Sequence, residues 1–323
     1  MIRASGLSKT YGDFAAVVDS SFAVEAGEIF GIVGPNGAGK TTTLKMLAGL
    51  IEPTNGSAQV AGYSASDPAM RHRLGFLPEE SPLYEDMTPR SYLRFFGDLY
   101  DVDREVADER IASTLDRLEL AYRDRRIGDM SKGMKRKVAI ARSLINDPAV
   151  LCYDEPASGL DPLTTNTVLA FTRELRDADK TVLFSAHNLY HVESVCDRLI
   201  IMNEGRIIAR GTIEEIREVY GQRTYRVYSD VAIDGAEPTD DGRFRAEVGT
   251  MADVEALQEA ATAAGGRVVD IRTDEPSLEA IFLDLTGQPM ADPRTADAAT
   301  EAERQPADGS STETAASGTE PDR

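Results

Sequence analysis

A glycine-rich stretch followed by a lysine and two threonines is the clearest sign of chemistry in this chain. It runs from Gly34 to Thr42 and reads Gly-Pro-Asn-Gly-Ala-Gly-Lys-Thr-Thr. The apolar run Glu28–Val33 before it predicts a buried strand, and Thr43–Leu50 after it has helical spacing. Glycines let the backbone curl so that successive N–H groups point at phosphate oxygens, and the new helix adds its N-terminal dipole. The context therefore favours a nucleotide site over an ordinary glycine turn.

The residues of this stretch have separate expected roles. Lys40 supplies a point charge to the β- and γ-phosphates, and the Thr41 hydroxyl ligates magnesium. The expected nucleotide-binding residues of the stretch are Gly34, Pro35, Asn36, Gly37, Ala38, Gly39, Lys40, Thr41 and Thr42.

Polar side chains follow two further predicted strands. Asp154 and Glu155 end a buried strand that starts at Ala149. In a nucleotide site, Asp154 would hold magnesium, and Glu155 would orient or deprotonate the attacking water. The strand Thr181–Ala186 ends at His187. A lone histidine is more often structural, but open α/β sheets place ligand groups at this end of a strand.

Ser131 and Tyr11 are less specific candidates for binding a phosphate and a base, respectively. Ser131 is an expected N-cap, and the cations Lys135–Lys137 in the first turn run against the helix dipole, which favours an anionic partner there. An ordinary capped helix with a solvated basic turn is the alternative. Tyr11, in the early turn Lys9–Gly12, could stack on an adenine ring. On this evidence alone, a surface aromatic beside a glycine turn explains Tyr11 better.

The elements around these residues form an α/β pattern with a helical insertion. The first thirty residues predict antiparallel strands, Glu52–Ser57 predicts a turn, and Leu74–Glu80 predicts a strand that ends in an acidic loop. Thr88 is the expected N-cap of a helix. An aromatic and apolar stripe on that helix could meet a partner, although core packing is its commoner fate. The stripe comprises Tyr92, Phe95, Phe96 and Leu99.

Composition narrows the function classes. The 323 residues carry 55 acidic and 35 basic side chains, a net charge of −20, which disfavours nucleic acid and anionic lipid. The balance is also similar to that of proteins from salt-loving organisms. No apolar run is long enough for a membrane span, and the start has no signal-peptide core, so we expect a soluble cytosolic chain. Cys152 and Cys196 are expected as buried apolar side chains, and the sequence shows no metal-binding cluster of histidines or cysteines.

From Ile2 to Arg217 the chain resembles the nucleotide-binding subunit of an ABC transporter. Gly34–Thr42 matches the Walker A motif, Val150–Asp154 with Glu155 matches Walker B and its catalytic glutamate, and Ser158–Asp161 matches the D-loop. The resemblance also assigns five single positions. They are His187 as the switch histidine, Tyr11 as the adenine-stacking aromatic, Ser131 and Gly133 as the core of the signature motif, and Glu79 in the loop that normally holds glutamine.

Glu79 and the signature Met130–Met134 depart from the usual family pattern. A carboxylate at position 79 can still approach magnesium. Both departures resemble the ABC-2 type export branch, as does Phe184–Leu189.

The resemblance implies an α/β P-loop ATPase domain at residues 1–220. It would contain an antiparallel β subdomain and a helical subdomain at about 82–127. A small α+β accessory domain is expected at 221–287. The segment 288–323 is rich in Ala, Asp, Glu, Thr, Ser and Gly and predicts a disordered acidic tail.

The expected function is ATP hydrolysis with magnesium. ATP would clamp two chains or paired ATPase subunits together, and hydrolysis would release them. This would drive a separate permease at the cytoplasmic face of the membrane, for export. The alternatives are a soluble ABC ATPase without a transport role, or a nucleotide-dependent regulator that hydrolyses little. No nucleic-acid partner is expected.

Overall fold

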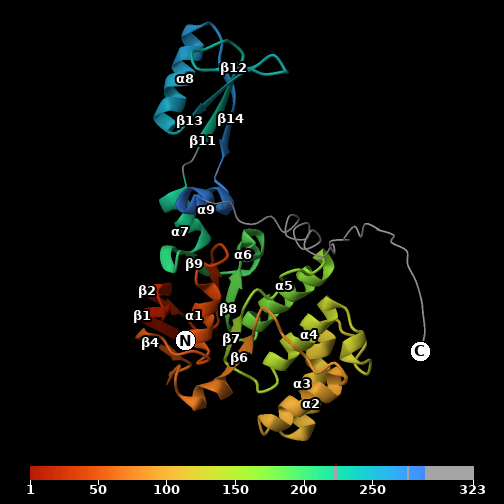
Figure 1. Ribbon diagram of the computed structural model, residues 1–323. Helices are drawn as coiled ribbons and strands as arrows, with labels where there is room; N and C mark the ends of the chain where they lie inside the picture. The colour runs from red at the N-terminus through yellow and green to blue at the C-terminus, as the bar shows by residue number, and fades with distance from the viewer. Residues whose placement is uncertain (222–223, 275, 288–323) are drawn as a thin grey trace, which may run out of the picture. The chain divides into compact units, whose positions relative to one another are not determined.

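The computed structural model describes residues 1–221, 224–274 and 276–287 (Figure 1). Within these ranges, no helix combines the length and the apolar character that crossing a membrane requires. The tail predicted at 288–323 lies outside the described residues.

The first sheet is antiparallel, with the strand order β2-β1-β4-β5. Its strands are β1 (Ile2–Tyr11), β2 (Phe14–Val24), β4 (Asn55–Val60) and β5 (Tyr63–Ser64). The antiparallel strands expected near the start are confirmed. Two predicted turns are wrong in part, because Lys9 to Tyr11 belong to β1 and Asn55 to Ser57 belong to β4. Both segments pair with other strands, and this pairing overrides their turn-like composition.

The second sheet is mainly parallel and has the order β10-β9-β3-β8-β7-β6. Its strands are β3 (Ile29–Val33), β6 (Leu74–Leu77), β7 (Val150–Tyr153), β8 (Thr181–Ala186), β9 (Arg198–Asn203) and β10 (Arg206–Gly211). Only β10 is antiparallel to its neighbour. The carboxyl ends of β3, β6, β7 and β8 therefore meet at one edge, which is where ligands bind in open α/β sheets.

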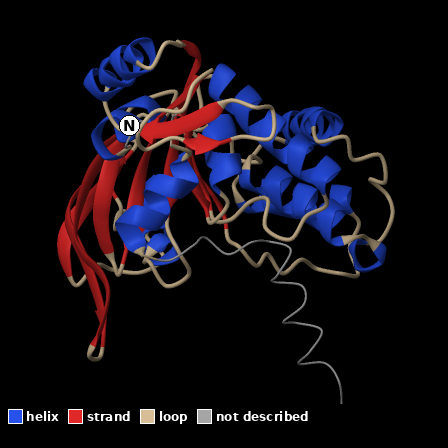
Figure 2. Cartoon of the chain, turned by 90° about the horizontal axis from the view of Figure 1, so that it is seen from above, coloured by secondary structure: helices blue, strands red, loops and turns tan. Residues whose placement is uncertain are grey.

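Two apolar cores lie against the parallel sheet, because side chains alternate along a strand. In β3, Ile29 and Val33 belong to one core, whereas Phe30 and Ile32 belong to the other. The helices around the sheet are α1 (Lys40–Leu47), α4 (Lys132–Ser143), α5 (Pro162–Asp177) and α6 (Leu189–Val195). The first core includes residues of α4, α5 and α6, and the second includes residues of α1. Figure 2 shows this mixed arrangement of helices and strands from above.

The predicted insertion contains α2 (Pro89–Leu99) and α3 (Arg104–Arg117). Short 3-10 helices lie on either side, η1 (Pro68–Arg73) and η2 (Ile127–Asp129). Thr88 caps α2 as expected. The side chains of the aromatic and apolar stripe differ in burial: Tyr92 is fully buried, whereas Leu99 is 64% exposed.

The C-terminal part of the described chain is α+β. Its elements are α7 (Ile213–Tyr220), β11 (Thr224–Ser229), β12 (Glu237–Pro238), β13 (Phe244–Val248), α8 (Met251–Ala263), β14 (Val268–Asp274) and α9 (Leu278–Thr286). The sheet order is β12-β13-β11-β14, and α8 packs against it. Phe282 of α9 and Ile216 of α7 join the first core of the parallel sheet.

Both cysteines are buried and free, as expected. Cys152 lies in β7, and Cys196 follows α6 as its C-cap residue.

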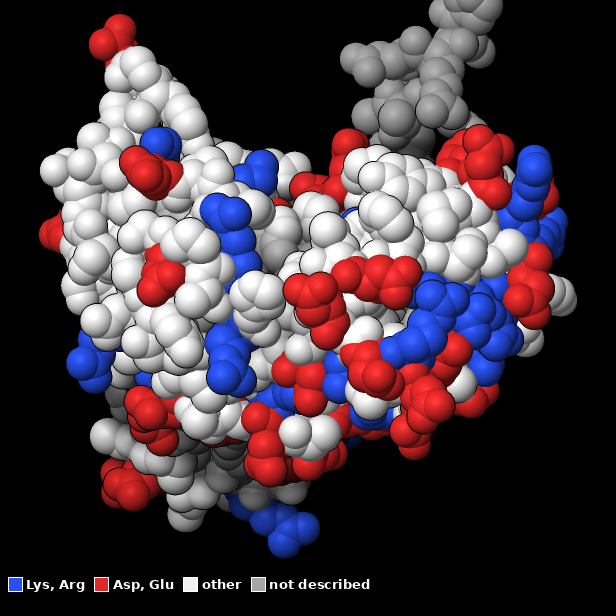
Figure 3. Space-filling model, turned by 90° about the horizontal axis from the view of Figure 1, so that it is seen from below, with Lys and Arg blue, Asp and Glu red and all other residues white. Residues whose placement is uncertain are grey.

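Acidic side chains on the surface have basic side chains as neighbours. On the face shown in Figure 3, Lys and Arg side chains gather next to Asp and Glu side chains. Many charged side chains of the described residues are paired, for example Arg94 with Asp108 and Arg117 with Glu174.

Candidate functional site

The glycine-rich loop joins the buried strand β3 to helix α1. Gly37 and Gly39 have φ angles of 81° and 98°, which side chains other than glycine adopt with strain. A Cβ atom on Gly39 would lie 2.5 Å from the carbonyl oxygen of Ala16, and one on Gly34 would lie 2.4 Å from that of Met202. The loop is therefore bent and tightly held at these glycines.

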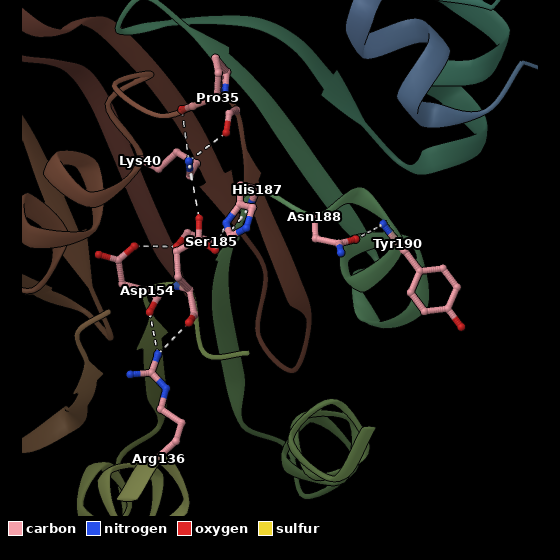
Figure 4. A network of polar contacts seen from close by, with 10 residues as sticks. Pro35, Lys40, Arg136, Asp154, Ser185, His187, Asn188 and Tyr190 are labelled. Carbon is pink, nitrogen blue, oxygen red and sulfur yellow. Dashed lines mark hydrogen bonds and ion pairs between the residues drawn. The ribbon is translucent and has the colours of Figure 1, made fainter. Parts of the chain in front are cut away.

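The loop forms the wall of a cleft of about 380 Å³. The residues that line it are Phe14, Ala16, Asn36, Gly37, Ala38, Gly39, Lys40, Thr41, Thr42, Glu79 and Glu155. The cleft thus joins the loop to carboxylates that follow β6 and β7. Gly34 and Pro35 stand at the base of the loop, where their carbonyls bind Lys40 (Figure 4).

Lys40 is buried at the start of α1 and its donors are directed inward. Its Nζ donates to the carbonyl oxygens of Gly34 and Pro35 at 2.8 and 3.2 Å. The same atom lies 3.6 Å from Oε1 of Glu155. A flexible lysine can exchange these contacts for phosphate oxygens, which makes it a point charge at the cleft.

Glu155 and His187 meet because they follow the neighbouring parallel strands β7 and β8. Nδ1 of His187 lies 2.7 Å from Oε2 of Glu155. Burial acts to raise the pKa of the Glu155 carboxyl, but the hydrogen bond with His187 and the charges of His187 and Lys40 outweigh it and lower that pKa. The hydrogen bond to Glu155 raises the pKa of the His187 imidazole. Each partner therefore favours the charged form of the other.

Glu155 also has a φ angle of 47°, which is uncommon for a residue with a side chain. Its backbone N–H donates to Oγ of Ser185 at 2.9 Å. The Ser185 hydroxyl in turn donates to Oδ1 of Asp154 at 2.7 Å. Ser185 thus holds the two consecutive carboxylate residues in place, a role that the sequence interpretation missed.

Glu79 follows β6 and lines the same cleft. Its carboxyl pKa is raised by burial first, and then by the negative charges of Glu155 and Asp154. Three carboxylates at one edge repel one another, so a bound cation is favourable there.

The oxygen donors at this edge suit magnesium, which prefers carboxylate and hydroxyl ligands together with phosphate and water. Thr41 lines the cleft, and Asp154 is buried behind it, next to Glu155. Among the described residues, no three His, Cys, Asp or Glu side chains form a cluster that could hold a metal by themselves. A magnesium site here would therefore need oxygens from the nucleotide.

Arg136 of α4 is a structural residue of the site that was missed. Its guanidinium donates to the carbonyl oxygens of Asp154 and Glu155 at 2.9 and 2.8 Å. It also donates to the carbonyls of Pro78 and Glu79 at 2.7 and 2.8 Å. Arg136 therefore ties the loops after β6 and β7 together. The basic run is therefore solvated only in part, because Lys132 is exposed whereas Arg136 and Lys137 are buried.

Ser131 and Gly133 are not among the residues that line the cleft. Ser131 is the N-cap of α4, as predicted, and accepts a hydrogen bond from the Met134 N–H at 3.3 Å. Gly133 faces Thr164 of α5, whose side chain would lie 3.0 Å from an added Cβ. Within one chain, the structure therefore does not bring Ser131 together with Lys40.

Tyr11 and Phe14 are opposite each other where β1 turns into β2. Phe14 lines the cleft and is 62% exposed, whereas Tyr11 is 49% exposed and is not among the lining residues. Lys9 lies over the Tyr11 ring, with its Nζ 5.2 Å from the ring centroid. The turn therefore carries two exposed aromatic side chains, of which Phe14 lines the cleft.

Comparison with known proteins gives consistent results. A family model described as ABC transporter matches residues 17–158. The chain is 41% identical over 226 residues to the ABC transporter ATP-binding protein NatA of Bacillus subtilis, covering 68% of this chain and 92% of that protein. It is 39% identical over 227 residues to the Nod factor export ATP-binding protein I of Burkholderia lata, covering 67% and 75%. A solved ATP-binding subunit of an ABC transporter is 32% identical, with a TM-score of 0.63 over 68% of this chain and 92% of that one.

Proposed function

The chain belongs to the ABC transporter family as an ATP-binding, ATP-hydrolysing subunit, and from this premise we propose that it drives a separate membrane permease for export. The observation that carries the proposal is the convergence of Lys40, Glu155 and His187 at one cleft beside the glycine-rich loop.

ATP binds with its phosphates in the cradle of Gly34–Thr42. The N–H groups of the loop and the start of α1 bind phosphate oxygens, and Lys40 leaves the loop carbonyls to contact the β- and γ-phosphates. Thr41 and Asp154 would hold Mg²⁺, and Glu79 could serve as a further ligand. The ion neutralises charge on the phosphates when it is bound. The adenine stacks on an aromatic side chain of the β1–β2 turn.

Glu155 acts on the water that attacks the γ-phosphorus. The carboxylate is ionised at neutral pH, since its pKa lies below 4.5, and in this form it can accept a hydrogen bond from the water and then its proton. His187 holds the carboxylate at Oε2 and leaves Oε1 toward the cleft. The bond between the γ-phosphorus and the bridging oxygen breaks as the water oxygen bonds to phosphorus.

A second chain completes the site. Ser131 caps α4 outside the cleft of its own chain. Its position at a helix N-terminus suits the γ-phosphate held by a partner subunit. ATP would then clamp two ATP-binding subunits together, and hydrolysis would release them.

A separate permease is supported by the lack, within the described residues, of a helix that could cross a membrane. The relative whose name states Nod factor export supports the direction of transport. The subunit would bind the permease at the cytoplasmic face of the membrane.

The proposal is tested by co-purifying the chain with any membrane protein found in a neighbouring reading frame and reconstituting both in lipid nanodiscs. We expect magnesium-dependent ATP hydrolysis that the membrane protein changes severalfold and that Lys40→Ala abolishes. Equal hydrolysis by the chain with and without every neighbouring membrane protein would contradict a transport role.

A further inference from the structure

The strand β14 has an open edge. It pairs with β11 on one side, and no other strand of the described residues pairs with its second side. The edge strand is seven residues long and reads Val-Val-Asp-Ile-Arg-Thr-Asp. Val269 and Ile271 are 41% and 38% exposed. An exposed edge with β-branched side chains is a template for pairing with another strand.

Charges on an edge strand usually oppose such pairing. In β14, however, acidic and basic side chains alternate on one face, as Asp270, Arg272 and Asp274. Nε of Arg272 donates to Oδ2 of Asp270 at 2.9 Å, and both side chains remain accessible. A strand with this pattern is complementary to itself when it runs antiparallel to a second copy.

One register pairs the opposite charges of Asp270 and Arg272. When Ile271 lies opposite Ile271 of a second chain, Asp270 lies opposite Arg272 on both sides of the symmetry axis. Val269 then lies opposite Thr273, which pairs two β-branched residues. Moving the register by two positions in either direction places Asp270 opposite Asp270 or Arg272 opposite Arg272. Like charges directly opposite are destabilising, so the first register is selected.

The pairing also keeps the apolar residues of both chains on one face of the joined sheet and the charged residues on the other. Ile271 is opposite Val227 of β11, a buried residue on the face covered by α8. Arg272 is opposite Arg226, on the face where the guanidinium of Arg272 lies over the Tyr228 ring. A two-fold axis perpendicular to the sheet keeps each face on its own side. The exposed Ile271 side chains would then pack together beside the two α8 helices, and the charged residues would pair on the other face.

We propose that β14 pairs antiparallel with β14 of a second copy of this chain, forming a continuous eight-stranded sheet. This contact uses none of the residues of the ATP cleft, and it is independent of the proposed ATP-driven clamp. The contact between two β14 strands (the β14 seam) is smaller than a typical stable interface, so by itself it holds two chains together only weakly. It is reinforced when other contacts already join the same chains.

Disulfide trapping in the full-length chain tests the register. Ile271→Cys places two thiols directly opposite, with Cα atoms about 4.5–5.5 Å apart, within reach of a disulfide. Thr273→Cys is the matched control, because it is also exposed but its two copies would lie about 13 Å apart along the strands. The native Cys152 and Cys196 are buried, so the wild-type chain gives the background.

We expect Ile271→Cys to form a disulfide-linked dimer at least severalfold faster than Thr273→Cys. A mixture of Val269→Cys and Thr273→Cys chains should link, whereas each chain alone should not. Linkage through Ile271→Cys should persist with Lys40→Ala, which separates this seam from ATP-driven association. Equal linkage at positions 271 and 273 would overturn the proposal, as would no linkage above the wild-type background.

Charge exchange is a second test. Asp270→Arg and Arg272→Asp each place like charges opposite in a pair of identical chains, so each should lower linkage through Ile271→Cys. The two variants mixed together should link, and so should the double variant that carries both changes. Melting temperatures check that every variant is folded. If both single variants link as well as the parent, the edge does not pair in this register.

Discussion

Nδ1 of His187 lies 2.7 Å from Oε2 of Glu155, at the ends of two adjacent parallel strands. The contact raises the pKa of the imidazole and helps to lower that of the carboxyl. The pair therefore affects both the stability of the nucleotide-free protein and its catalysis.

In the nucleotide-free protein, the pair formed by Glu155 and His187 should make the stability depend on pH. The Glu155 contribution is present above its ordinary pKa of 4.5 and is lost as pH falls through the lowered value. The His187 contribution is present below its ordinary pKa of 6.5 and is lost as pH rises through the raised value. The melting temperature of the wild type minus that of His187→Ala should therefore be largest near pH 5–6.5 and shrink toward pH 9. In a Glu155→Gln background this maximum should disappear, because burial and the charge of Lys40, which lower the His187 pKa, then act without the opposing Glu155 carboxylate. A constant difference in both backgrounds would contradict the pairing.

Glu155→Gln should retain ATP binding and lower turnover by ~10²-fold or more, as expected for loss of a general base. The amide keeps the shape of the side chain but cannot accept the proton. Equilibrium ATP binding and steady-state phosphate release measure the two effects separately. Asp177→Asn, at an exposed carboxylate paired with Arg176, is the control and should leave turnover unchanged. An unchanged rate for Glu155→Gln would remove Glu155 from the mechanism.

Arg136→Met should destabilise the fold by ~2–5 kcal/mol, because it leaves several buried carbonyl groups without their donor. The comparison is Arg104→Met, since Arg104 is 59% exposed and only pairs with Asp98 at 3.6 Å. Losing an exposed pair typically costs ~1 kcal/mol or less. Urea unfolding of both variants tests this, and similar losses at the two positions would contradict a tying role for Arg136.

Tyr11→Ala should weaken ATP binding by ~1–3 kcal/mol, the usual contribution of one base–aromatic stack. Binding of inorganic tripolyphosphate, which has no base, should not change. Phe14→Ala is the matched variant from the other side of the same turn. Isothermal titration with both ligands separates the two residues. If only Phe14→Ala weakens ATP binding, the base stacks on Phe14 and the assignment to Tyr11 is wrong.

Local patterns predict much of this fold. The buried strands before Gly34, Asp154 and His187, and the caps Thr88 and Ser131, follow from hydrophobic runs and short-range hydrogen bonding. The hairpin of β9 and β10 was not predicted. Its apolar runs are recognised as strands only when β9 is seen to pair with β3.

Long-range contacts also explain what was missed in the site. Arg136 looks like one cation of a basic run, and only the folded chain shows it under the loops after β6 and β7. Ser185 is similarly unremarkable until β8 places its hydroxyl against Asp154. Phe14 had one usable signal, its position three residues after Tyr11 across a glycine turn.

We propose that Ser131 of one chain acts on ATP held by Lys40 of another. Glu155→Gln with ATP and magnesium should accumulate a dimer, because hydrolysis no longer opens it. Adding Ser131→Arg should abolish that dimer, since arginine overfills the approach of the α4 N-terminus to the γ-phosphate. ATP affinity of the single chain should survive, because Ser131 lies outside its own cleft.

Light scattering on chains that also carry Arg272→Asp, which weakens the β14 seam, measures this association directly. Molar KCl screens the net charge of −20. We predict an ATP-dependent doubling of mass for Glu155→Gln and none for Glu155→Gln with Ser131→Arg. An ATP-dependent dimer that forms equally well with Ser131→Arg would contradict the account and leave Ser131 as a helix cap.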